Sequence, residues 1–140
     1  MRARPGSTLI EQVILLLILG IIISAGVSSG VRLRDTATVH GAAREVAELF
    51  ALARDRATAT GTRTAVRLDM TQHRIVVHAG TDTLARLELG PSAVQLVTTR
   101  DSMAYLPSGL GYGAANLRVI VSRGASRDTL TVSRLGRVKR

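Results

Sequence analysis

The pattern of hydrophobic and polar positions divides the chain into three parts, each with its own period. In the first part, residues 12–31 contain no charged residue and no proline, and residues 13–23 are apolar apart from one glycine. A stretch of about 20 residues is long enough for a helix to cross the hydrocarbon core of a bilayer, roughly 30 Å thick. We therefore expect a transmembrane helix segment at residues 7–31.

In the second part, apolar residues recur at steps of three and four, the spacing of one face of an α-helix. That face consists of Val39, Ala43, Val46, Phe50, Ala53 and Ala57. Gly61 ends the pattern, so we expect an amphipathic continuation of the helix over residues 32–60. Glycine and serine residues weaken the joint near residues 26–36, and two independent helices are the alternative.

In the third part, apolar and polar residues alternate, which is typical of strands with one buried face. Turn-forming residues separate the alternating stretches. We expect strands at residues 64–69, 74–79, 83–89, 94–98, 117–122 and 129–133, a loop at 107–113 and a turn at 123–128. The sequence thus predicts an α+β fold, in which the long N-terminal helix packs on an antiparallel β domain of residues 61–140.

The charge of the chain is concentrated in its last third. The formal net charge is +9, and residues 102–140 hold seven basic residues against Asp128 alone, a net charge of +6. Such a segment attracts polyanions or acidic protein surfaces. A solvated tail that keeps the protein soluble would have the same composition.

Candidate chemistry for catalysis is missing from the sequence. There is no cysteine, and His40, His73 and His78 are not at metal-ligand spacing with any pair of acids. The glycines at 109, 111 and 113 do not form a phosphate-binding motif. We therefore expect neither enzymatic activity nor a metal or cofactor.

The segment before the apolar run carries an acid that needs an explanation. Glu11 lies at the edge of the run, where a carboxylate is costly to bury. One explanation is a capping box, because Thr8 and Glu11 have the T-x-x-E spacing. Another is an ordinary secretory signal, since residues 2–26 have a basic start, an apolar core and small residues for cleavage.

A third explanation is a resemblance. The segment Gly6-Ser7-Thr8-Leu9-Ile10-Glu11, after a short basic leader, resembles the class III signal of type IV pilins and type II secretion pseudopilins. The resemblance implies that a prepilin peptidase removes leader residues 1–6 by cleaving between Gly6 and Ser7, and that Ser7 is then N-methylated. Ser7 departs from the phenylalanine usual at this position. Glu11 would dock the subunit by pairing with the terminal amine of a neighbour.

The order of elements also resembles the GspH/FimT group of minor pseudopilins and minor pilins. The matching features are the alanine-rich helix end at residues 49–57, the Tyr105–Gly109 loop and the closing segment Leu130–Val138. The resemblance implies a type IV pilin-like, single-pass protein of the bacterial inner membrane with its C-terminal domain in the periplasm. Its implied function is that of a minor pseudopilin, which assembles with other pseudopilins or minor pilins in a type II secretion system.

The alternative function implied by this group is DNA binding. In its DNA-binding members a C-terminal G-R-x-R motif contacts DNA. This chain keeps Gly136 and Arg137 but has Lys139 in the last place, which meets a phosphate without the bidentate fork of arginine. The alternative is thus a FimT-like minor type IV pilin for natural transformation. It would contact the DNA backbone through Arg134, Arg137, Lys139 and Arg140.

Overall fold

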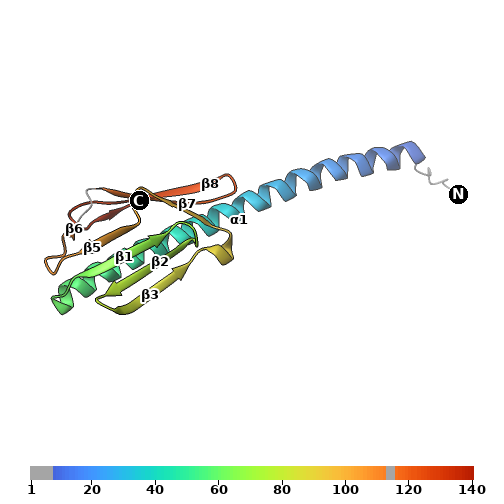
Figure 1. Ribbon diagram of the computed structural model, residues 1–140. Helices are drawn as coiled ribbons and strands as arrows, with labels where there is room; N and C mark the ends of the chain where they lie inside the picture. The colour runs from blue at the N-terminus through green and yellow to red at the C-terminus, as the bar shows by residue number, and fades with distance from the viewer. Residues whose placement is uncertain (1–7, 113–115) are drawn as a thin grey trace. The chain divides into compact units, whose positions relative to one another are not determined.

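A computed structural model describes residues 8–112 and 116–140 of the chain, without the side chains of residues 25, 26 and 28. A long helix, α1 (Leu9–Thr60), is followed by antiparallel strands (Figure 1). The helix continues without a break through residues 26–36, so the alternative of two independent helices is wrong. The chain divides into two compact units, the first ending at Arg34 and the second comprising Asp35–Arg140.

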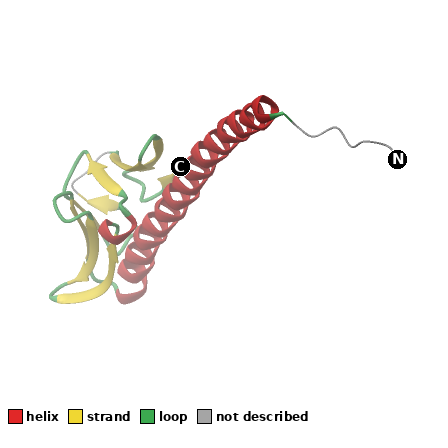
Figure 2. Cartoon of the chain, turned by 90° about the vertical axis from the view of Figure 1, so that its right-hand side faces the viewer, coloured by secondary structure: helices red, strands yellow, loops and turns green. Residues whose placement is uncertain are grey.

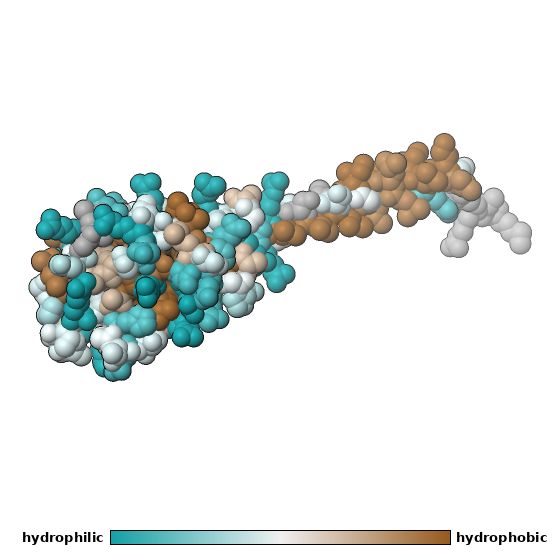
Figure 3. Space-filling view, viewed as in Figure 1, coloured by the Kyte–Doolittle hydropathy of each residue, from teal (hydrophilic) through white to brown (hydrophobic). Residues whose placement is uncertain are grey.

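In the first unit, α1 is exposed on all sides. Every residue from Leu9 to Arg34 whose exposure is described is exposed, Leu9 by 81% and Leu33 by 73%. On the face that Figure 3 shows, apolar side chains cover much of this segment. By length and composition the helix can cross a membrane. Because apolar surface in water costs about 25 cal/mol per Å², a bilayer or other chains must cover this segment.

In the second unit, α1 is amphipathic and contributes one side of the core. The predicted face is confirmed, since Val39, Ala43, Val46, Phe50, Ala53 and Ala57 are all at most 1% exposed. The alanines at 43, 53 and 57 let the strands approach the helix closely. Figure 2 shows the strands along one side of this part of α1.

Two antiparallel sheets cover the helix. The first sheet has the order β3-β2-β1-β5-β6. Its strands are β1 (Thr64–Asp69), β2 (Arg74–Ala79), β3 (Asp82–Glu88), β5 (Ser102–Tyr105) and β6 (Gly111–Tyr112). The second sheet has the order β4-β7-β8-β9. Its strands are β4 (Gln95–Thr98), β7 (Leu117–Arg123), β8 (Ser126–Val132) and β9 (Val138–Lys139), and the short helix η1 (Gly90–Ser92) precedes it.

Both sheets bury their apolar side chains in the same core. Val66 and Ile75 of the first sheet and Val119 and Leu130 of the second belong to one buried cluster with Phe50. The alternation of burial along β1 and β7 follows the period of two that the sequence predicts. The predicted α+β architecture is therefore confirmed.

Some elements differ from the prediction. Strand β5 has no alternating pattern of its own and forms because β1 offers a pairing edge, with Ala65 opposite Ala104. Strand β6 lies inside the predicted loop at 107–113 and pairs with β5. The predicted turn at 123–128 shrinks to two residues, because Gly124 adopts a positive φ of 56° and lets β8 begin at Ser126.

The turn before β9 is held tightly against the loop before β6. The Gly111 N–H donates to the Arg134 carbonyl at 2.9 Å, and the Gly136 N–H donates to the Ser133 carbonyl at 2.9 Å. Gly136 has a φ of 75°, and a Cβ there would clash with the Gly109 carbonyl oxygen and lie 3.1 Å from the Tyr105 ring. The glycine of the C-terminal motif therefore has a packing role, and it sets the position of the residues that follow it.

This role predicts a large effect for Gly136→Ala. Positive φ at a residue with a side chain costs roughly 1–3 kcal/mol, and the clash adds to it. We expect the variant to be destabilised by more than about 2 kcal/mol, measured by denaturant unfolding of the full-length protein in detergent.

The matched control is Gly41→Ala. Gly41 is helical and an added Cβ would meet no atom within 4 Å, so alanine should stabilise α1 by about 0.5–1 kcal/mol. An unchanged unfolding midpoint for Gly136→Ala would contradict the packing role.

Candidate functional site

The N-terminal candidate site is described only in part. Gly6 and Ser7 lie outside the described residues, so their cleavage and methylation stay predictions. Glu11 lies in the first turn of α1, where its N–H donates to the Thr8 carbonyl at 3.1 Å. Its side chain is exposed and forms no ion pair with any residue that the structure describes. An exposed carboxylate thus borders a segment that needs an apolar covering.

The four basic residues predicted to contact DNA lie in the turn before β9, in β9 itself and directly after it. Arg134 and Arg137 lie in the turn before β9, and their side chains are exposed. Lys139 is paired in register with Thr131 of β8, whereas Val138 before it packs on the core. Because successive strand residues point to opposite faces, Lys139 lies on the outer face of the second sheet.

Arg140 is engaged within the chain. Its Nε donates to Asp128 Oδ2 at 2.6 Å, and its Nη2 contacts Nδ1 of His40. Asp128 also contacts His40 Nδ1 at 2.9 Å, so one carboxylate links β8 to both α1 and the end of the chain. Within residues 8–112 and 116–140, Arg134, Arg137 and Lys139 have no such ion pair. Three of the four predicted cations are therefore available to a ligand.

The Asp128 carboxyl titrates below its ordinary range. Partial burial raises its pKa, but hydrogen bonds from Arg140 and His40 outweigh burial, and the net shift is downward. Sequence reasoning missed this cluster because His40 and Arg140 are 100 positions apart and no local pattern joins them. Only the packing of β8 and β9 beside α1 reveals it.

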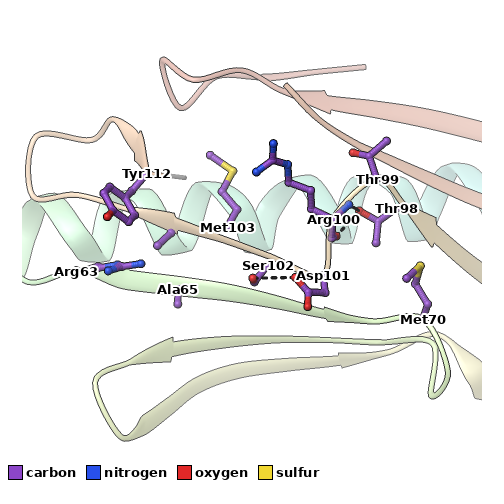
Figure 4. A pocket seen from close by; sticks show the side chains of 11 residues that line it. Arg63, Ala65, Met70, Thr98, Thr99, Arg100, Asp101, Ser102, Met103 and Tyr112 are labelled. Atoms are coloured by element: carbon purple, nitrogen blue, oxygen red, sulfur yellow. Dashed lines mark hydrogen bonds between the residues drawn. The ribbon is translucent and has the colours of Figure 1, made fainter. Parts of the chain in front are cut away.

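A second candidate is a hollow of about 740 Å³ that lies along β1 and β5 of the first sheet (Figure 4). Its floor includes the small side chains of Ala65 and Ala104. The Arg63 guanidinium stacks over the Tyr112 ring at 4.4 Å from the ring centre. Asp101 accepts a hydrogen bond from the Ser102 hydroxyl at 3.0 Å. The hollow therefore carries two arginines, Arg63 and Arg100, against the single carboxylate of Asp101, together with several hydroxyls.

The histidines have structural partners. His73 Nδ1 accepts the Leu96 N–H at 3.2 Å, and His78 Nδ1 lies 3.3 Å from the Thr83 hydroxyl. Over the part of the chain that the structure describes, no three His, Cys, Asp or Glu side chains gather in a group that could hold a metal ion.

The lowered pKa of Asp128 predicts a pH-dependent contribution to stability. Asp128→Asn should destabilise the full-length protein in detergent by about 1–3 kcal/mol near pH 7, because charge-assisted hydrogen bonds are lost. Since the folded pKa is below the unfolded one, this contribution is present above the unfolded pKa and is lost as pH falls through the folded pKa. The denaturant midpoints of the wild-type protein and of Asp128→Asn, measured against pH, should therefore converge in acid. A difference between them that stays constant with pH would contradict an origin in the Asp128 charge.

Comparison with known proteins places these features in a family. Residues 42–136, more than half of the chain, match the family described as "Type II transport protein GspH". No curated protein sequence matches the chain.

Solved structures share the fold. The type IV minor pilin FimU of Pseudomonas aeruginosa (strain PAO1) superimposes with a TM-score of 0.63 at 12% identity, over 72% of this chain and 86% of that one. The minor pseudopilin EpsH of the Vibrio cholerae Type 2 Secretion System gives a TM-score of 0.58 at 15% identity, over 72% of this chain and 94% of that one. The type IV pilin-like architecture is thus confirmed, and together with the match over residues 42–136 it follows that the chain belongs to the GspH family.

Proposed function

We propose that the chain is a minor pseudopilin of a type II secretion system, which assembles from the inner membrane into a periplasmic pseudopilus. The observation that carries the proposal is the first part of α1, an apolar helix exposed along its described length and bordered by the exposed carboxylate of Glu11. Membership of the GspH family supports a role as a pilin-like subunit. That the subunit belongs to a type II secretion system, and that its second unit lies in the periplasm, are the proposed parts.

In this proposal, the membrane holds the apolar segment until other subunits replace the lipid. A prepilin peptidase would cleave before Ser7 and so create a new terminal amine near the membrane surface. Glu11 of one subunit would then pair with the amine of a neighbour. A charge inside an apolar bundle is retained when a partner charge meets it, and removing one partner of a buried pair costs about 3–5 kcal/mol. The pair would therefore fix the register of each new subunit.

A second candidate function is DNA binding by a minor pilin during natural transformation. The observation that favours it is the exposure of Arg134, Arg137 and Lys139, none of which forms an ion pair with a described residue. Arg140 would contribute only after release from Asp128. No aromatic side chain lies in the closing segment 130–140, so contacts would be to phosphates and would weaken with salt.

The docking role of Glu11 predicts a specific defect for Glu11→Gln. The variant should be cleaved normally, but its incorporation into filaments should fall at least about tenfold. A tenfold change corresponds to about 1.4 kcal/mol, which is less than the cost of about 3–5 kcal/mol for removing one partner of a buried pair. Incorporation is measured by quantitative blotting of sheared filaments against membranes from the same cells.

The matched control is Glu45→Gln, which removes an exposed carboxylate from the second part of α1. Normal incorporation of Glu11→Gln, or an equal loss in the control, would count against docking by Glu11.

DNA binding predicts a gel shift by the full-length protein in detergent that depends on salt. Replacing Arg134, Arg137 and Lys139 by alanine should weaken the shift for all sequences and reduce the salt slope by roughly 3. The control replaces three exposed arginines elsewhere, Arg56, Arg67 and Arg86. If the wild-type protein gives no shift at low salt, this second function is excluded.

A further inference from the structure

The outer face of the second sheet can be derived from its strand register. Arg118 of β7 lies opposite Thr131 of β8, and Thr131 lies opposite Lys139 of β9. Directly opposed residues point to the same face of a sheet. Arg118 and Lys139 are exposed, so this row faces away from the core.

The neighbouring rows extend the same face. Ile120 of β7 lies opposite Val97 of β4, and Ser122 lies opposite Arg127 of β8. Val97 is 51% exposed, Ile120 is half-buried and Arg127 is exposed. The intervening residues, such as Val119 and Val121, are fully buried on the other side. We call the surface formed by Arg118, Arg127, Lys139, Val97 and Ile120 the basic face.

The basic face carries no opposing charge from its own strands. Asp128 is the one acidic residue in β4, β7, β8 and β9, and it is turned toward His40 and Arg140. The first sheet differs, because there Asp69 pairs with Arg74 at 3.3 Å. Arg123 of β7 pairs with Asp35 at 2.9 Å, but Arg118, Arg127 and Lys139 form no ion pair with any residue that the structure describes.

We propose that the basic face docks an acidic surface of another pilin-like subunit. The proposal rests on the proposed function, since it names the surface through which the second unit contacts a neighbour in the filament. The aliphatic side chains of Val97 and Ile120 provide apolar contact, and the arginines beside them provide charge pairs. This combination of an apolar centre with arginine around it is typical of protein–protein interfaces.

Two other occupants fit the basic face less well. Single-stranded nucleic acid is bound through aromatic side chains on which bases stack, and β4, β7, β8 and β9 contain no aromatic residue. A second copy of this chain would present the same basic face, and its overall charge is positive. An acidic surface is attracted by the charges that repel a second copy.

The test places a photo-crosslinking amino acid at Thr129, which lies opposite Ile120 on the basic face. The full-length chain is produced in cells together with each pilin-like subunit of its own system, one tagged subunit at a time. A second crosslinker position, Leu16 in the apolar part of α1, reports filament assembly independently of the basic face.

Charge reversal then identifies the contact. We expect the Thr129 position to crosslink one tagged subunit, and Arg118→Glu, Arg127→Glu and Lys139→Glu together to reduce that product by about tenfold. The control replaces three exposed arginines elsewhere, Arg56, Arg67 and Arg86, by glutamate, which changes the net charge by the same amount. This control should leave the yield of the Thr129 crosslink unchanged. Glutamine at the first three positions should give a smaller loss in the same direction, even if full reversal lowers stability.

Several results would overturn the proposal. One is crosslinking from Leu16 but not from Thr129, which would leave the proposed function intact and remove the basic face from it. An equal loss in the control would show an effect of net charge alone. Loss of a DNA gel shift on reversal, without any subunit crosslink, would assign the face to nucleic acid. If neither position crosslinks a pilin-like subunit, the proposed function itself fails.

Discussion

The packing of the second part of α1 beneath two antiparallel sheets is the interaction on which the folded unit depends. Phe50, Ala43, Ala53 and Ala57 have no exposed surface, and both sheets contribute their inner side chains to this one core. The same helix continues, unbroken, into a segment whose described side chains are all exposed. Over about half its length, α1 therefore buries its apolar face within its own chain. Over the rest, its apolar side chains can be buried only by other molecules.

The same core determines which basic residues remain available. Asp128 holds Arg140 against His40 of α1, and Gly136 packs the last turn against the Tyr105 ring. The Tyr105 hydroxyl is itself buried, and burial raises its pKa to about 12. These contacts fix β9, so Lys139 joins Arg118 on the outer face of the second sheet, while Arg137 stays in the turn. Arg137, Lys139 and Arg140 are close in the sequence, but in the structure they have different surroundings.

Much of this architecture follows from the sequence because it depends on local periodicity. The buried helix face and most strands repeat at three to four or at two residues, and the structure confirms them. Strand β5 depends on pairing with β1, which no local pattern reveals. The exposure of Arg134 and Arg137 could be expected from their polarity, whereas the capture of Arg140 requires knowing that residues 40, 128 and 140 meet. Long-range contacts therefore decide the details of the candidate sites.

The central claim is that the apolar part of α1 is delivered to the membrane and then packed among subunits as a processed pilin-type helix. Its most direct test is the intact mass of the full-length protein extracted from membranes of cells that contain a prepilin peptidase. The account predicts a chain that begins at Ser7 and carries one added methyl group. A chain that still contains residues 1–6, or one that begins after Gly26, would contradict it.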